Sequence, residues 1–342
     1  MKRLLALILV LFFAVTAFAE EEGLTILITA VGDCVIGDMQ ISPVSHRFRR
    51  FLTENNNDYG YFFAAVKDLL EQDDLTLINL EGPITTCTDA EPGQTFYFRG
   101  DPEYVNILLA GSVEVANLAN NHSHNFGDEG YSETMSLLSE AGIGACGYDD
   151  VYYVSVKGVT VGFAGFDRWR STKEDMVRVV TEAKQNCDLL IVSYHGGIET
   201  MYQMAADVRE AGQICIDAGA DLVVGNHSHV YGGIEIYKGK YIISSLGNFC
   251  YGGDAYPNDY TCTIFRQAFT VTEDGTVSDG GIDIIPALIS TQTGRNNYQP
   301  CVMTDTAKAI KHFNGVLKIS NFTASDVKWL EDSFAVQNGL DK

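Results

Sequence analysis

Short apolar runs that end in polar or glycine-containing turns recur along the chain. Five of these runs are too short for helices and are rich in leucine and β-branched residues, which is typical of buried strands. They span residues 25–31, 75–80, 113–118, 189–193 and 222–224. Segments with helix-like patterning separate them, at about 61–71, 131–140, 173–185 and 204–217. This alternation of strand and helix predicts an α/β fold.

The second half of the chain has a different pattern. Residues 152–166 and 234–246 each place a Lys-Gly turn between two strand-like runs, and a third hairpin turn is expected at 273–276. Because hairpins are antiparallel, the second half mixes them with the βα units. Two sheets packed face to face, with helices outside, would accommodate both. From about Ser290 the pattern weakens, so residues 291–342 are expected to form a polar C-terminal appendage with one or two helices.

The first nineteen residues are typical of a secretory signal peptide. Lys2 and Arg3 precede a continuous apolar run over 4–15, and Ala17 and Ala19 are the small residues expected before a cleavage site at Glu20. A retained membrane anchor is the alternative, but the run is too short to span a bilayer comfortably. We therefore expect a secreted or cell-envelope protein.

Composition and net charge exclude some classes of binding partner. The chain has 342 residues, a formal net charge of -22 and 46% hydrophobic residues, so it is long and apolar enough for a full core. Such an acidic chain is a poor partner for nucleic acid or anionic lipid. Its eight cysteines form no CxxC pair. Several are expected as small buried apolar residues, although export would permit disulfides.

The residues that follow the predicted strands can hold a metal ion. Because the carboxyl ends of strands share one edge of an α/β sheet, these residues can converge on one crevice. Five of the seven histidines fall in three of these turns, whereas histidines with only structural roles would scatter. Any one of these residues alone would more often be a simple turn residue. The set is Asp33, Glu81, Asn121 with His122, His195, and His227 with His229.

Their chemistry favours borderline cations. Carboxylates can bridge two ions, and amide oxygens and neutral imidazoles can complete the shells, so we expect two divalent ions, manganese, iron or zinc. Such ions polarise a phosphoryl oxygen and lower the pKa of a bound water, and a nearby histidine can act as the general acid. His227 and His229 are expected to point the same way, as alternate residues of an extended segment.

Six motifs, in order, resemble the CapA family of bacterial capsule and poly-γ-glutamate synthesis proteins, which has a calcineurin-like metallophosphatase fold. They are VGDCVIGD, NLEGPIT, LANNHSHNFG, SYHGGIE, VVGNHSHV and SSLGNF, and the similarity covers Leu24 to Tyr251. The resemblance implies a four-layer α/β/β/α sandwich of two mixed sheets. It assigns residues 24–290 to this domain.

The resemblance also implies roles for single residues. Asp33 and His229 would bind one ion, Asn121, His195 and His227 the other, and Glu81 would bridge them. His122 would protonate the leaving group, and Arg99 and Asn248 would contact substrate. The chain departs from its relatives at Asp38, Asn125, Asn226 and Ser228. It also carries Asp33-Cys34-Val35 where ordinary phosphatases have Asp-x-His, so one metal shell is thinner.

Three functions follow as alternatives. The first is a metal-dependent hydrolase acting on a phosphoester or on an acyl or amide centre of an envelope polymer. The second is a non-catalytic accessory subunit of a membrane polymer synthesis and export complex. The third is a plain secreted phosphoesterase.

Overall fold

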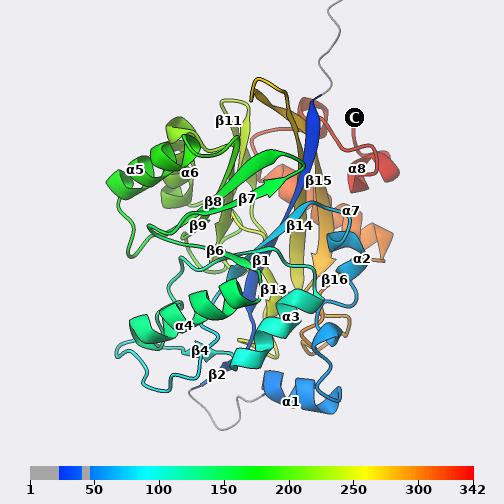
Figure 1. Ribbon diagram of the computed structural model, residues 1–342. Helices are drawn as coiled ribbons and strands as arrows, with labels where there is room; N and C mark the ends of the chain where they lie inside the picture. The colour runs from blue at the N-terminus through cyan, green and yellow to red at the C-terminus, as the bar shows by residue number, and fades with distance from the viewer. Residues whose placement is uncertain (1–22, 41–46) are drawn as a thin grey trace, which may run out of the picture.

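Two mixed β-sheets form the centre of the computed structural model, which describes residues 23–40 and 47–342 (Figure 1). The signal peptide predicted for residues 1–19 lies outside the described residues. The strands of the larger sheet are β1 (Leu24–Val35), β3 (Leu75–Leu80), β5 (Val115–Asn117), β6 (Gly144–Cys146), β13 (Asn248–Tyr251), β14 (Thr261–Val271), β15 (Val277–Leu288) and β16 (Cys301–Val302). Their order is β16-β15-β14-β1-β3-β5-β6.

Strand β1 has two partners on the same side. It pairs antiparallel with β14 from Leu24 opposite Val271 to Ala30 opposite Phe265. Beyond this point β13 takes over in parallel, with Asp33 opposite Asn248. On its other side β1 runs parallel to β3, so Asp33 lies among strand ends that share one edge of the sheet.

The smaller sheet has the order β11-β12-β10-β9-β8-β7. Its strands are β7 (Tyr152–Val156), β8 (Val159–Asp167), β9 (Leu189–His195), β10 (Leu222–Asn226), β11 (Ile234–Tyr237) and β12 (Lys240–Ile243). The two Lys-Gly hairpins are present as β7–β8 and β11–β12, and the third joins β14 to β15. A two-stranded ribbon joins β2 (Asp38–Met39) to β4 (Phe98–Arg99).

Three apolar cores separate the layers. The middle core joins the inner faces of both sheets, with Ile28 of β1, Phe265 of β14 and Ile191 of β9 all buried in it. The outer face of the larger sheet packs against α1 (Arg47–Glu54), α2 (Lys67–Leu70), α3 (Val105–Ala110) and α4 (Gly127–Glu140). The outer face of the smaller sheet packs against α5 (Lys173–Lys184) and α6 (Ala206–Ala218). The predicted four-layer α/β/β/α sandwich is therefore confirmed.

One predicted helix is largely wrong. Residues 61–71 form turns between a 3₁₀ turn (Tyr59–Tyr61) and the single-turn helix α2. Phe62 and Phe63 are fully buried there, and Phe62 stacks on Phe48 with ring centroids 4.4 Å apart. Packing of these aromatic rings thus overrides the local helical pattern. Among the described helices, none combines the length and apolarity needed to cross a membrane.

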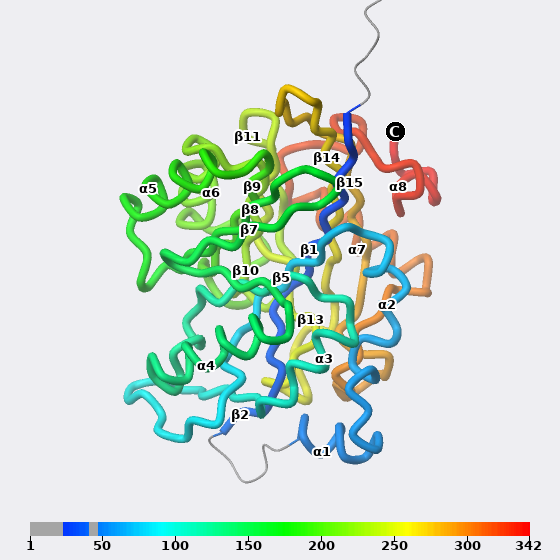
Figure 2. The backbone as a smooth tube through the Cα atoms, in the orientation of Figure 1, coloured from blue at the N-terminus to red at the C-terminus, as the bar shows by residue number. Residues whose placement is uncertain are grey.

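The C-terminal segment packs onto the larger sheet (Figure 2). It contains β16 and two helices, α7 (Thr306–Lys318) and α8 (Phe334–Gln337). Phe313 of α7 is fully buried in the middle core and lies against Trp329 and Phe334, with centroids 5.5 and 5.6 Å away. The backbone N–H of Phe334 donates to Asp283 Oδ1 at 2.8 Å. The inner side of the segment expected as a polar appendage is therefore apolar and shares the core.

All eight cysteines carry free thiols. Five of them are buried, as expected for small apolar residues; these are Cys34, Cys146, Cys215, Cys250 and Cys262.

Candidate metal centre

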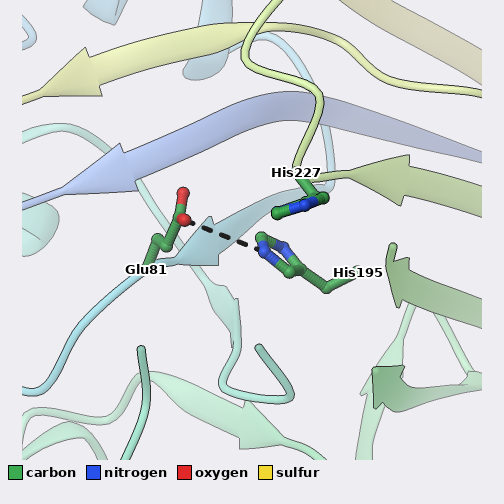
Figure 3. Close-up of side chains that lie close together, drawn as sticks. All are labelled: Glu81, His195 and His227. Carbon is green, nitrogen blue, oxygen red and sulfur yellow. Dashed lines mark ion pairs between the residues drawn. The ribbon is translucent and has the colours of Figure 1, made fainter. Parts of the chain in front are cut away.

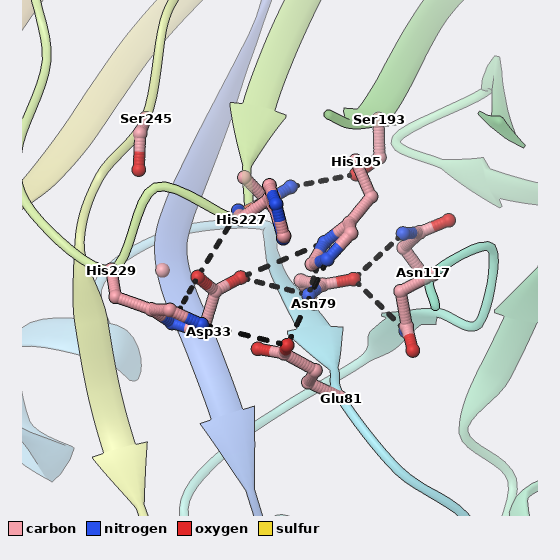
Figure 4. A network of polar contacts seen from close by, with 12 residues as sticks. Asp33, Asn79, Glu81, Asn117, Ser193, His195, His227, His229 and Ser245 are labelled. Atoms are coloured by element: carbon pink, nitrogen blue, oxygen red, sulfur yellow. Dashed lines mark hydrogen bonds and ion pairs between the residues drawn. The ribbon is translucent and has the colours of Figure 1, made fainter. Parts of the chain in front are cut away.

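The candidate site lies where the carboxyl ends of strands from both sheets meet (Figure 4). Asp33 and Glu81 come from the ends of β1 and β3 in the larger sheet. His195 is the last residue of β9, and His227 directly follows β10 in the smaller sheet. The six residues expected as metal ligands therefore come together between the two sheets, as strand-end geometry requires.

Glu81 lies at the middle of this cluster. Its Oε1 atom is 3.7 Å from His195 Nε2 and 3.9 Å from the Nε2 atoms of His122 and His229; Figure 3 shows its contact with His195. Both carboxylate oxygens are buried, and neither has a hydrogen-bond partner among the described residues. Burial raises the pKa of Glu81 to about 8; nearby Asp33 adds to this shift and His229 opposes it.

Asp33 is held by a network of amides. Asn79 Nδ2 donates to Asp33 Oδ1 at 2.8 Å, and the backbone N–H of His227 donates to Oδ2 at 3.2 Å. The Asn79 side chain also lies 3.1 Å from His195 Nδ1 and accepts hydrogen bonds from Asn117 and Asn120, at 2.8 and 3.3 Å. Asn79 therefore fixes the orientation of Asp33 and His195 together.

His195 is fully buried, and its Nε2 lies 2.8 Å from Asn121 Oδ1. Burial lowers the pKa of His195 well below its ordinary value, and the nearby histidines lower it further. The ring is therefore neutral, the form in which imidazole binds a metal ion.

The two histidines after β10 reach the site by a different route from the one predicted. The extended segment expected at 227–229 is wrong, because His227 and His229 have φ angles of 96° and 57° in a bend. His229 Nδ1 lies 2.9 Å from Asn248 Oδ1 and 3.3 Å from Asp33 Oδ2. His227 Nδ1 is buried and has no hydrogen-bond partner among the described residues.

Nitrogen and oxygen atoms in the cluster form three groups whose members lie within 4.8 Å of one another. The groups are Glu81, His195 and His227; Asp33, Glu81 and His229; and Glu199, His227 and His229. Glu81 belongs to two groups, which is the arrangement that a bridging carboxylate requires.

These residues fit bound cations. Glu81 and His227 together present three buried atoms without a partner, and burying such atoms is costly unless something binds them. Burial alone would lower the pKa of His229, but Glu81 and Asp33 raise it to about 10. The negative charge that raises the pKa of His229 would also favour a bound cation, which could replace the protons held by Glu81 and His229.

His122 lies at the edge of the cluster. Its ring packs 4.4 Å from the ring of Phe98, and its Nδ1 is 3.1 Å from Asn125 Oδ1. Burial lowers the pKa of His122 to about 4, although Asn125 acts in the other direction.

Arg99, expected as a substrate contact, does not join the cluster. It follows Phe98 in β4, and neighbouring residues of a strand point to opposite faces. Its Nη1 donates to the carbonyl oxygen of Cys87 at 2.8 Å. It lines a separate hollow of about 350 Å³ with Tyr97, Phe126 and other residues outside the cluster.

Three further residues border the site and were not predicted. The half-exposed ring of Trp169 lies 5.0 Å from His227 and 6.0 Å from His195. The ring of Tyr251 lies 5.3 Å from that of His229, and exposed Glu199 completes the third donor group. Glu199 and Trp169 are exposed in loops, where nothing in the sequence separates them from ordinary surface, and Tyr251 is a buried strand residue of a type common in cores.

The fold and site define a class: a two-sheet α/β/β/α protein with a cluster of carboxylates and histidines, suited to metal, at the shared strand edge. The family model described as "Bacterial capsule synthesis protein PGA_cap" matches residues 27–252. The chain belongs to this family, and the CapA resemblance is confirmed.

Two named relatives are similar to most of this chain. A capsule biosynthesis protein CapA of Bacillus anthracis is 28% identical over 306 residues, which cover 78% of this chain and 68% of the relative. A "probable polyglutamine synthesis accessory protein" of Mycobacterium tuberculosis is 30% identical over 269 residues, or 68% of this chain and 70% of the relative. A solved phosphatase of Mycoplasma pneumoniae aligns with a TM-score of 0.48 at 14% identity, covering 77% of this chain and 94% of that one.

Proposed function

We propose that this chain is an exported, dinuclear metal-dependent hydrolase that acts during the synthesis of a capsule polymer of the poly-γ-glutamate type. The observation that carries the proposal is Glu81. Its two oxygens are buried without partners, at the meeting point of two groups of metal-ligating side chains. The names of the relatives supply the polymer context, and the N-terminal pattern supports export.

The two donor groups that share Glu81 would each hold one ion. Asp33 and His229 would hold one ion, and His195 and His227 the other, with Asn121 close to the second group through His195. Oxygen and imidazole donors of this kind suit manganese, iron or zinc. When bound, two such ions supply a nucleophilic hydroxide near neutral pH and polarise the bond to be cleaved.

Other residues of the site orient the metal ligands or transfer protons. Asn79 holds Asp33 and His195 in register, as outer hydrogen bonds do in metal sites. Asn125 Oδ1 holds the Nδ1 side of His122, which leaves Nε2 facing the cluster. Because Asn125 Oδ1 can only accept, the proton of a neutral His122 lies on Nδ1, so His122 would pass a proton from Nε2 to the leaving group only after Nε2 has itself been protonated.

An accessory, non-catalytic role is the second candidate. Val35 occupies the position at which ordinary metallophosphatases supply another histidine, so the group around Asp33 has one donor fewer. The Mycobacterium tuberculosis relative is itself named an accessory protein. In this role the ions would stabilise the fold of a subunit in a polymer-synthase complex.

Elemental analysis and activity assays on one preparation test both candidates. Chain lacking residues 1–19 is loaded with manganese, zinc or iron and then assayed on p-nitrophenyl phosphate and on poly-γ-glutamate. We expect two ions per chain, with metal and activity both reduced in H195A and H229A. H122Q should keep both ions and lose activity, whereas the matched H124Q variant, whose ring stacks on Tyr131 instead, should keep both.

The outcomes separate the candidates. Two ions without activity on either substrate would favour the accessory role. Activity that survives in both H195A and H229A, or a chain that binds no metal, would overturn the proposal.

A further inference from the structure

A second hollow is lined by residues of α7, of strands β14 and β15 and of the loops that follow β9 and β10. Its volume is about 640 Å³, within the range of pockets that bind small molecules. Its lining residues include Tyr202, Tyr231, Leu288, Met303, Lys311 and His312. Those after residue 252 lie beyond the segment that matches the family model, so family membership does not account for this pocket.

Aromatic rings form one wall of the pocket. The rings of Tyr202 and Tyr231 meet edge to face at 5.0 Å, and the ring of His312 lies 4.2 Å from that of Tyr231. His312 Nε2 lies 2.8 Å from Thr263 Oγ1, which fixes this ring in place. Leu288 and Met303 add aliphatic surface. A wall of this kind suits the apolar body of a ligand.

Gly315 lies beside the aromatic wall of the pocket. It lies inside α7, where glycine is less favourable than any residue except proline. A Cβ atom at this position would lie 2.8 Å from Tyr231 Oη and would therefore project toward the pocket wall. An alanine at this position would therefore displace the Tyr231 hydroxyl from its place in the wall.

The pocket is lined by two carboxylates and two lysines, and both carboxylates have internal partners. Asp259 already accepts hydrogen bonds from Tyr202 Oη and from Thr261 N and Oγ1, at 2.7, 2.8 and 2.7 Å. Asp305 caps α7 by accepting from the backbone N–H of Lys308 at 3.1 Å. The acidic groups are therefore committed.

The donors are not. Among the described residues, Tyr231 Oη and Lys311 Nζ have no hydrogen-bond or ion-pair partner, and the only ion pair of Lys308 is with Asp305 at 3.6 Å. Both lysines are exposed at the mouth of the pocket. The formal charges of the two lysines balance those of Asp259 and Asp305, so the pocket is distinguished by its free donors and not by a net charge. These donors can receive the oxygens of an anionic group.

We propose that this pocket binds an amphiphilic organic carboxylate. Its apolar body would lie against Tyr202, Tyr231 and Leu288, and its carboxylate would contact Lys308, Lys311 and the hydroxyl of Tyr231. The site does not depend on bound metal. However, Tyr231 follows His229 by two residues and Tyr202 follows Glu199 by three, so a ligand here contacts the loops that border the metal centre.

Calorimetry with the metal-loaded chain tests this inference. Octanoate and 3-phenylpropionate are the probes, and octan-1-ol is the neutral counterpart of octanoate. We expect both carboxylates to bind, with octan-1-ol at least tenfold weaker. The K308A/K311A double variant and G315A should each weaken octanoate binding at least tenfold, whereas K318A, at the exposed end of α7, should not change it.

A γ-linked glutamate trimer serves as a separate arm. Octanoate binding tighter than the trimer would support an amphiphilic acid as the ligand, whereas tighter trimer binding would overturn it in favour of an end of a polar polymer. Equal affinity for octanoate and octan-1-ol, octanoate binding unchanged in both variants, or no binding of any probe would overturn it. Metal content, measured on the same samples, shows independently whether the dinuclear proposal holds.

Discussion

Glu81→Gln is the most informative perturbation of the proposed centre. Glutamine has nearly the same shape as glutamate but carries no charge, and Glu81 belongs to both donor groups assigned to the two ions. The variant should therefore weaken both ions while leaving the packing of the site in place. Loss of a bridging ligand should cost at least the factor of about 100 seen when outer partners of metal ligands are removed.

The size of the effect follows from ligand linkage. At a metal concentration of 100 Kd, one bound ion adds about 2.7 kcal/mol to the free energy of unfolding. For 342 residues the entropy of unfolding is roughly 0.7 kcal/mol/K, so each ion should raise the melting temperature by about 4 °C. With affinity lowered about 100-fold, the same metal concentration adds only about 0.4 kcal/mol, or under ~1 °C.

Without metal the order of stability should reverse. Burial raises the pKa of Glu81 from 4.5 to about 8, so the folded state favours the protonated form more than the unfolded state does. The metal-free wild type should consequently lose stability as the pH rises from about 4.5 through 8. The variant has no charge to bury and should be at least as stable as wild type at pH 8.5 in a chelator.

Differential scanning fluorimetry with and without manganese or zinc measures both effects. The matched variant is E140Q, at an exposed position at the end of α4, which should behave like wild type in both conditions. A metal-induced shift in E81Q equal to that of wild type would refute the assignment of Glu81 as a bridging ligand. A chelated E81Q protein markedly less stable than chelated wild type would refute the argument from unpartnered oxygens.

Three further predictions concern the core, the pH response and the amide network. F313A should lower the free energy of unfolding by about 3–5 kcal/mol, because the ring is fully buried; V336A, at a 38% exposed position, should change it by less than about 0.5 kcal/mol in urea titrations, and similar costs for the two would show that the C-terminal segment does not share the core. Burial raises the pKa of Asp283 from 3.8 to about 7, so this carboxyl should contribute a loss of up to about 4 kcal/mol between pH 4 and pH 8, apart from the loss due to Glu81 in metal-free protein, and D283N should flatten the profile in denaturant titrations at each pH; parallel profiles would contradict this. N79A removes a donor to Asp33 and should lower metal affinity by about 10–100-fold in competition titrations, and unchanged affinity would argue against an orienting role.

The fold could be predicted because each buried strand can be recognised from its own local sequence. Each buried strand is a continuous apolar run, and the Lys-Gly turns define the hairpins. The C-terminal segment was underestimated for a different reason. Ala309, Phe313 and Val316 of α7 do carry helical spacing on one buried face, but a three-residue stripe amid polar neighbours is weak until its partner surface is known.

Site residues could be predicted where they directly follow an apolar strand, because the ends of such strands share one edge of the sheet. Glu81 and His195 follow apolar strands and were found for that reason. Asn79, buried inside β3, looks like an interior residue because its partners Asp33, Asn117 and Asn120 are distant in sequence. The left-handed backbone conformation of His227 and His229 could not be predicted from the sequence either, because non-glycine residues rarely adopt it.

Arg99 lies outside the metal cluster, and its contact with substrate stays a prediction. In the two-residue strand β4, one position faces His122 and the other faces away. Which residue takes which face depends on register within the ribbon that β4 forms with β2, and a strand of two residues has no apolar alternation from which that register can be read.

The pairing of β1 with β14 determines when this protein can fold during its synthesis. Strand β1 lies in the interior of the larger sheet, yet its antiparallel neighbour is residues 261–271. Leu24 therefore cannot form its pair until Val271 has been synthesised. A ribosome releasing the chain in order leaves that edge of β1 without its partner until most of the polypeptide has emerged. Contacts of such long sequence separation are slow to form and expose apolar strands meanwhile. The nascent chain should therefore remain open and available to chaperones for most of translation, with compaction concentrated at its end.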